Sequence, residues 1–255
     1  MRFQFIFRLS LLIFTITSLV SCEKKEEFTS DAVADYSIPL QKGKYIIYRL
    51  DSLVFTNFGR NTETHRYQVK HEVDAELTDN LGKPAWRIYT YIRDSAGTQY
   101  WTPTGSYVIT PFKDRVEVTE DNLRVIKMHL PVKEGYSWRG NSYLPDEPYY
   151  AAYDFNNDND MKDWEFSYDI FEDATAYGGK TYTDVYTVLQ QDDSFNVPIV
   201  DITKYGYKTL SLEKYSKSVG MVFRQYELWE YQPNSSGPSP YKTGFGITMW
   251  MIDHN

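Results

Sequence analysis

An Asp- and Asn-rich run in the middle of the chain has the spacing of a calcium-binding loop. Alternating side-chain oxygens and a closing glutamate can converge on one hard cation, as in an EF-hand loop. Loop position 6 is usually glycine and here is Asn159, which tolerates a left-handed backbone. The alternative is a solvated connection whose side chains cap their own turn. The candidate ligands, at loop positions 1, 3, 5, 7 and 12, are Asp154, Asn156, Asp158, Asp160 and Glu165.

Aromatic rings offer a second kind of site, because the chain contains 23 Tyr and 6 Trp. Rings on loops can stack against sugars, whereas rings within strands normally fill the core and the faces of a sheet. Core filling is the alternative for every ring in this chain. The candidate ligand-binding rings, in or beside segments that have loop composition, are Trp101, Tyr149, Tyr150, Tyr153 and Trp164.

No catalytic motif accompanies these residues. The sequence lacks a phosphate-binding glycine loop, an HExxH motif and a paired CxxC motif. His65 and His71 are six residues apart, and a strand of that length separates them by about 20 Å, too far for one metal ion. With 35 acidic residues, a glycosidase-like carboxylate pair can arise by chance, but the sequence names no such pair. We therefore expect a non-catalytic protein with no cofactor other than calcium.

The single cysteine, Cys22, directly follows a secretory signal. Arg2 and Arg8 form a basic region, and an apolar stretch extends from there to Val20. This stretch is interrupted by Ser and Thr, and it is shorter than the ~20 apolar residues that a membrane-spanning helix needs. Residues 1–21 are therefore predicted to be a cleaved signal peptide, with Cys22 at the new N-terminus.

The motif "LVSC" (19–22) resembles the lipobox of bacterial lipoproteins. This resemblance implies that Cys22 carries diacylglycerol and an amide-linked acyl chain such as palmitate, and several chains anchor a protein firmly to a membrane. Lys25-Glu26-Glu27 resembles the signal that directs lipoproteins of Bacteroidota to the outer face of the outer membrane. The implied location is the outer membrane, at its periplasmic face or at the cell surface. Residues 22–37 are predicted to be a flexible tether, because they contain little apolar material.

The charge excludes one class of partner. The formal net charge is −8, and removal of Arg2 and Arg8 with the signal peptide makes it −10. Nucleic-acid binding requires clustered Lys and Arg. No nucleic acid is therefore expected as a partner, and the expected contact with a membrane is through the N-terminal lipid.

Residues 38–255 are predicted to form one β-rich domain. In 67–77 apolar and polar residues alternate with a period of two, which is typical of a strand with one buried face, and His71 lies on that face. Asp79–Gly82 has turn composition, and 85–93 is predicted to return as the partner strand. The same pattern recurs in later segments, and helical patterns are nearly absent. The predicted fold is all-β with little helix: an antiparallel meander that forms a curled sheet, half-barrel or sandwich.

Three phrases in this domain resemble the uncharacterised outer-membrane lipoproteins of Bacteroidota. They are "IPLQKGKYIIYRL" (38–50), "LPVKEGYSWRGN" (130–141) and "YSKSVGMVFRQYELWEYQ" (215–232). The resemblance implies a strand at each phrase but no activity.

Three functions follow from these observations. The first is a membrane-anchored envelope lipoprotein that acts as a non-catalytic binding module for a lipid, a glycan or a protein partner, since concave β-structures often hold ligands. The alternative is a structural or assembly subunit of an outer-membrane complex. The third is a glycan-acting hydrolase. An internal cavity would favour the first function, an exposed apolar patch the second, and a cleft with two buried carboxylates the third.

Overall fold

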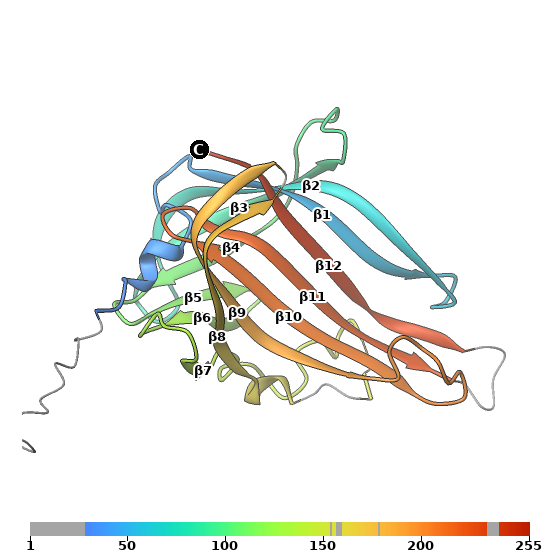
Figure 1. The fold of residues 1–255 in the computed structure, drawn as a ribbon. Coiled ribbons are helices and arrows are strands. Elements are labelled where there is room, and N and C mark those ends of the chain that lie inside the picture. The colour runs from blue at the N-terminus through green and yellow to red at the C-terminus, as the bar shows by residue number, and fades with distance from the viewer. Residues whose placement is uncertain (1–28, 154, 157–159, 178, 234–239) are drawn as a thin grey trace, which may run out of the picture.

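The computed structural model describes residues 29–153, 155–156, 160–177, 179–233 and 240–255. Nearly all regular structure is strand, and two short 3-10 turns, η1 (Val33–Tyr36) and η2 (Met161–Asp163), complete it. Within these ranges no helix is long and apolar enough to cross a membrane. The strands are β1 (Tyr45–Thr56), β2 (Asn61–Thr78), β3 (Pro84–Asp94), β4 (Thr102–Pro111), β5 (Arg115–Glu120), β6 (Leu123–His129), β7 (Ser137–Arg139), β8 (Glu165–Tyr177), β9 (Lys180–Phe195), β10 (Gly206–Ser216), β11 (Gly220–Gln232) and β12 (Tyr241–His254) (Figure 1).

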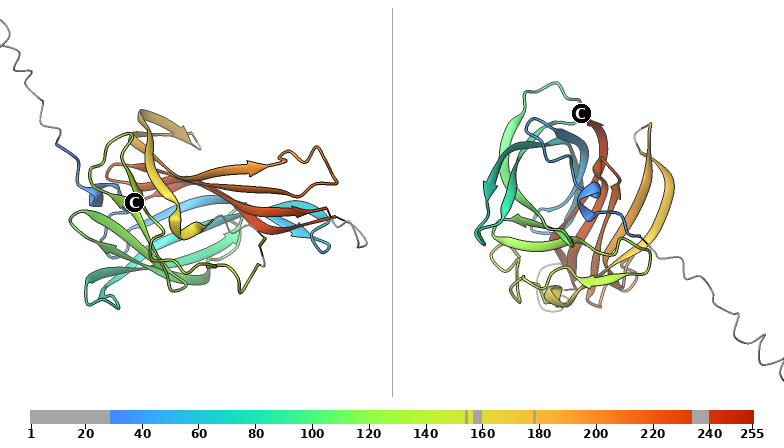
Figure 2. Two further views of the ribbon diagram at one scale, coloured as in Figure 1. Left: turned by 90° about the horizontal axis from the view of Figure 1, so that it is seen from below. Right: turned by 90° about the vertical axis from the view of Figure 1, so that its left-hand side faces the viewer.

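The strands form one 12-stranded antiparallel sheet in the order β6-β5-β4-β3-β2-β1-β12-β11-β10-β9-β8-β7. Strands that are consecutive in the chain pair with each other, except β6 and β7, which lie at the two edges of the sheet. β1 also pairs with β12, and this pairing joins the two halves of the meander. The sheet curls round on itself (Figure 2). The predicted all-β antiparallel meander is therefore confirmed, and its form is a nearly closed barrel.

A short seam joins the two edges of the sheet. The Ile126 amide of β6 donates a hydrogen bond of 2.8 Å to the Gly140 carbonyl just after β7. The Trp138 indole nitrogen donates to the Ile126 carbonyl at 2.9 Å. These bonds satisfy backbone groups that an open sheet edge would expose to pairing with other chains. The seam brings β6 alongside the second half of the sheet.

The turns follow from local sequence. At the predicted turn between β2 and β3, the Asp79 carboxylate accepts the backbone N–H groups of Leu81 and Lys83, both at 2.8 Å. Between β5 and β6, Asp121 and Asn122 adopt positive φ angles of 49° and 64°, as a two-residue type I′ hairpin turn requires. The first of these turns was predicted from its composition, and at both turns the adjoining strand residues pair in register.

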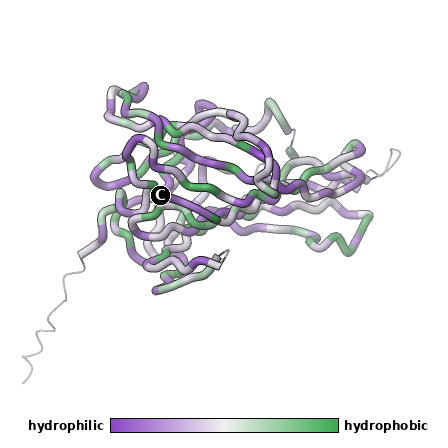
Figure 3. The backbone as a smooth tube through the Cα atoms, turned by 90° about the horizontal axis from the view of Figure 1, so that it is seen from above, coloured by the Kyte–Doolittle hydropathy of each residue, from purple (hydrophilic) through white to green (hydrophobic). Residues whose placement is uncertain are grey.

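Apolar and polar stretches follow one another along the strands (Figure 3), and the apolar side chains fill the interior. In β11, for example, Val222, Tyr226 and Leu228 share the buried face. His71 in β2 is enclosed beside Tyr48 and Tyr107, on the buried face that the period-two pattern predicts.

The folded core begins earlier in the chain than position 38. Val33 and Tyr36 of η1 are fully buried, and η1 lies across one end of the curled sheet (Figure 2). The Tyr36 hydroxyl donates to Asp31, and the backbone at Ile38 packs directly on Gly220. The segment predicted as tether, 22–37, therefore ends inside the folded domain, because two apolar residues in it supply enough burial to order it.

Candidate binding cavity

A cavity of about 220 Å³ lies inside the curled sheet. Strands from both halves contribute to its wall, and η2 and the connection between β7 and β8 close one side of it. The volume exceeds the ~150 Å³ of an apolar cavity that holds benzene. It falls below the ~300–1,000 Å³ of sites for drug-sized molecules. The space therefore suits a small ligand. Its apolar wall includes Ile46, Ile109, Val118, Leu123, Val125 and Met128.

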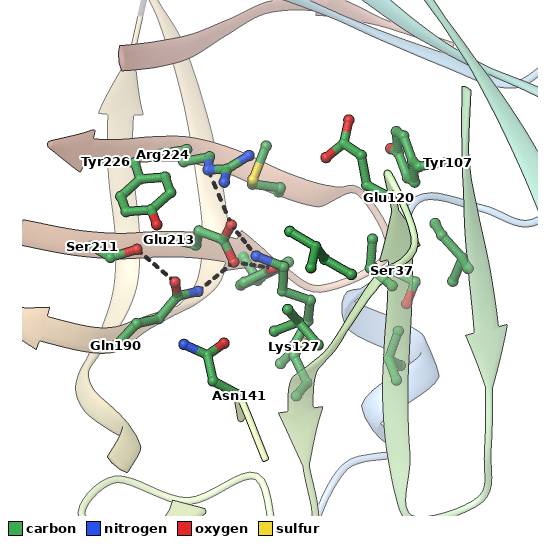
Figure 4. Close-up of a pocket in the computed structure, with 18 of the residues that line it drawn as sticks. Ser37, Tyr107, Glu120, Lys127, Asn141, Gln190, Ser211, Glu213, Arg224 and Tyr226 are labelled. Atoms are coloured by element: carbon green, nitrogen blue, oxygen red, sulfur yellow. Dashed lines mark hydrogen bonds and ion pairs between the residues drawn. The ribbon is translucent and has the colours of Figure 1, made fainter. Parts of the chain in front are cut away.

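One buried carboxylate organises the polar part of this wall. Glu213 of β10 is only 1% exposed, and its Oε1 accepts a hydrogen bond of 2.8 Å from Lys127 Nζ. Arg224 Nε lies 3.3 Å from the same oxygen, so that Glu213 stands between the two cations (Figure 4). Lys127 comes from β6 and Arg224 from β11. The ion cluster therefore links opposite halves of the sheet across the interior.

The second oxygen of Glu213 is also satisfied. Gln190 Nε2 donates to Glu213 Oε2 at 2.8 Å, and the Tyr215 hydroxyl donates to it at 2.6 Å. Ser211 in turn donates to Gln190 Oε1 at 2.6 Å, which fixes the orientation of the amide. A buried charge is tolerated only when it is paired and hydrogen-bonded in this way.

The cluster holds Glu213 in its ionised form. Burial raises its pKa, but Lys127 and Arg224 outweigh that effect and lower the pKa to about 2. Burial lowers the pKa of Lys127, and the contact with Glu213 opposes that shift. A carboxyl group that stays ionised at neutral pH cannot act as a general acid. The cluster therefore presents fixed charges, and no general acid, to the cavity.

A second polar group lies on the β2 side of the cavity. His71 Nδ1 is 3.0 Å from the Tyr107 hydroxyl, and the Tyr48 ring packs edge-on against the imidazole at 5.1 Å. Burial, with a smaller contribution from the Arg224 charge, lowers the pKa of His71 to about 4. The imidazole is therefore neutral at physiological pH. It adds hydrogen-bonding capacity to the wall without adding charge.

The five predicted ligand-binding rings lie in different environments. Tyr149 and Trp164 line the cavity, and the Tyr149 hydroxyl accepts a hydrogen bond from Tyr226 at 3.1 Å. Tyr150 is 68% exposed, and together with Tyr153 it borders a separate recess of about 30 Å³. Trp101 packs against the Arg93 guanidinium at 4.1 Å. The structure therefore brings Tyr149 and Trp164 to one site and leaves the five rings without a common face.

The predicted calcium loop and lipid anchor fall partly or wholly outside the described residues. Asp154, Asp158 and Cys22 belong to the undescribed part of the chain. Of the other proposed ligands, Glu165 accepts a hydrogen bond from Ser137 at 2.7 Å, and Asp160 has a left-handed backbone with φ of 44°. Among the residues whose structure is given, no three His, Cys, Asp or Glu side chains are grouped as a metal site. Calcium binding stays a prediction.

The ion cluster was not predicted from the sequence, although the sequence holds a signal for one of its members. Arg224 occupies the same alternating phase as the buried Val222, Tyr226 and Leu228 of β11. A charged residue on the apolar face of a strand requires a partner inside the protein. The phase of the pattern therefore marks an inward-pointing cation, but it does not say which distant strand supplies the carboxylate.

No family model matches the chain, and a search of curated proteins finds no match. Among solved structures, one similar chain is described as an exported protein with a YmcC-like fold from Bacteroides fragilis. The two are 11% identical, with a TM-score of 0.38, over 86% of this chain and 99% of that one. Another is described as a lipoprotein from Parabacteroides distasonis, at 9% identity and a TM-score of 0.39, over 89% of this chain and 100% of that one.

Both TM-scores are below 0.5, and these two similarities show neither a family nor a role for this chain. At such identities and TM-scores they assign no ligand or activity to this chain.

Proposed function

We propose that the protein is a non-catalytic binding module of the bacterial envelope and that its internal cavity holds a small ligand. The observation that carries this proposal is the space of about 220 Å³ inside the nearly closed sheet. Apolar walls with a few fixed polar groups are what small-molecule sites share. Here the polar groups are the Glu213 cluster on one side and His71 with Tyr107 on another.

The proposed setting is the outer membrane, with the domain anchored through acylated Cys22. The signal-like residues 1–21 and the lipobox-like motif support this placement. We propose that the domain binds its ligand either at the periplasmic face of the outer membrane or at the cell surface. The membrane is then the partner of the lipid chains, while the cavity is free to serve a different molecule.

A role as an assembly subunit is the second candidate, because apolar side chains are exposed at hairpin tips. Phe58 between β1 and β2 is 87% exposed, and Val200 between β9 and β10 is 82% exposed. Exposed apolar groups that gather in one place mark docking surfaces. The hairpins carrying them extend toward the same end of the molecule (Figure 1).

Glycan hydrolysis is the least supported role. A glycosidase needs a protonated carboxyl group as general acid, together with a second carboxylate. Glu213 is the buried carboxylate of the cavity, and its pKa of about 2 keeps it ionised. The other acids in the wall, Glu120 at the end of β5 and Asp121 in the turn after it, are exposed.

Native mass spectrometry of the protein extracted from its own membranes tests the proposal. A bound molecule of a few hundred daltons is expected in the wild type. It should be lost in Val118→Trp, which fills the cavity, and retained in Thr119→Trp, because successive side chains of a strand point to opposite faces. A ligand retained in Val118→Trp would place binding elsewhere, and a stoichiometric protein companion with an empty cavity would favour the assembly role.

A further inference from the structure

Arg224 makes few bonds for a guanidinium group that faces an internal cavity. A guanidinium carries five N–H donors. Arg224 Nε is buried and has no hydrogen-bond partner within the described part of the chain. Its contacts there are the 3.3 Å ion pair with Glu213 and the face of the Tyr226 ring at 5.5 Å. Glu213 meanwhile receives its closer bonds from Lys127, Gln190 and Tyr215.

Asn141 is a second polar group that faces the cavity. It is 3% exposed and lines the cavity, where its amide points inward near Gln190 and Lys127 (Figure 4). Its side chain makes no hydrogen bond to any residue whose structure is described, whereas its backbone carbonyl bonds to Leu144. An amide in the cavity wall that bonds to no described residue can bond to a ligand there.

In the buried part of the cavity wall, cations outnumber carboxylates. Lys127 and Arg224 oppose the one buried carboxylate there, Glu213. The other acids in the wall, Glu120 at the end of β5 and Asp121 in the turn after it, are exposed, and the charge of Glu120 still acts on Arg224. An anion bound beside Lys127 and Arg224 would therefore meet one cation in excess of Glu213, and a cationic ligand there would meet repulsion.

We infer that the cavity binds a monocarboxylate with a short apolar tail, its carboxylate held by Arg224. This inference rests on the proposed function, since it names the chemical class of the ligand in that same cavity. A planar guanidinium matches the two oxygens of a carboxylate. The wall formed by Leu123, Val125 and Met128 accepts the tail. The cavity volume limits the tail to a size between benzene and a drug-sized molecule.

The test compares three probes with the same tail and different heads: octanoate, 1-octanol and octylamine. Each is titrated into the full-length protein purified in a nonionic detergent, with micelles alone as the blank. The 13C shift of the labelled carbon next to the head group reports binding. Octanoate is expected to bind roughly 10- to 100-fold more tightly than octanol, as charge-assisted hydrogen bonds predict, and octylamine most weakly.

Two variants locate the effect. Arg224→Gln should abolish the preference for octanoate while octanol still binds, so that retained octanol binding shows an intact cavity. Arg139→Gln, which changes an exposed arginine on β7, should leave all three affinities unchanged. Glu120→Gln should strengthen octanoate binding several-fold, because it removes the charge at the margin that acts against an anion.

The outcomes separate the inference from the proposed function. Equal binding of octanoate and octanol, or tighter binding of octylamine, overturns the inference and leaves a cavity that binds ligands. Failure of all three probes also overturns it, and native mass spectrometry of the membrane-extracted protein then decides the proposed function. Detection of a different bound molecule would preserve that function, and an empty cavity would refute it.

Discussion

Replacing Glu213 with glutamine should destabilise the protein by about 3 kcal/mol at pH 7. The native pKa of about 2 lies below the ordinary value of 4.5. That difference, at ~1.36 kcal/mol per pKa unit, corresponds to about 3 kcal/mol of native-state stabilisation of the charged form. Glutamine retains much of the size and hydrogen bonding of Glu213 but leaves Lys127 and Arg224 as two buried cations without a counter-charge. Loss of one partner from a buried pair costs a similar amount, ~3–5 kcal/mol.

The stabilisation from Glu213 should decrease as the pH falls. Because the native pKa is depressed, the stabilisation from Glu213 is fully present above pH 4.5 and is lost as the pH falls through about 2. About half of it should remain near pH 3. The difference between the wild type and Glu213→Gln should therefore shrink on acidification, because protonation gives the wild type a neutral side chain as well.

Urea unfolding followed by tryptophan fluorescence at pH 7, 5, 3 and 2 measures this difference. Glu172→Gln is the matched control, because Glu172 of β8 pairs with Lys214 of β10, across the intervening β9, at partly exposed positions. Its loss should cost less than about 1 kcal/mol. Equal stability of Glu213→Gln and the wild type at pH 7, or a difference that persists unchanged at pH 2, would refute the electrostatic account of the cluster.

Four further predictions follow from other features. Between pH 6.5 and about 4, unfolded His71 binds a proton and native His71 does not, so the wild type should lose about 3 kcal/mol of stability as the pH falls through this range. His71→Gln should not show this loss. Unfolding midpoints of both proteins across the range measure the difference. Gly220→Ala should lower the free energy of unfolding by more than about 1 kcal/mol, because φ is +106° and a Cβ would lie 2.7 Å from the Ile38 nitrogen. An unchanged midpoint of urea unfolding would contradict this. Cys22→Ala should move the protein out of the membrane pellet on fractionation, and a protein still in the pellet would count against acylation. If calcium binds the loop at 154–165, EGTA should lower the melting temperature and excess calcium should restore it. Equal melting temperatures with EGTA and with calcium would favour the solvated turn.

The sequence carries local information about this fold more clearly than long-range information. Period-two alternation identified the strand at 67–77, and the carboxylate of Asp79 explains the turn after it. Neither pattern states that the meander curls until β6 meets the segment after β7. That closure depends on the accumulated twist of twelve strands and on Trp138, whose bonding partner lies on β6.

The same limit explains why the site was only partly predicted. Tyr149 and Trp164 were identified by ring type and loop composition, and both line the cavity. The pairing of Lys127 with Glu213 joins positions 86 residues apart, and no spacing rule within one strand relates them. The alternating phase marks Arg224 as inward-facing, but it does not mark Glu213, which shares its phase with Thr209 and Ser211 while Leu210 and Leu212 occupy the other phase.

The pairing of β1 with β12 also sets the order of events in folding. Tyr45 of β1 bonds through its backbone to Asn255, a separation of 210 residues. Each half of the meander can form from neighbouring hairpins, but β1 keeps one unpaired edge until β12 reaches it. Closing so long a loop before its contacts form gives a high contact order, which slows folding. During that interval the free edge of β1 is the place where a second chain could add in place of β12.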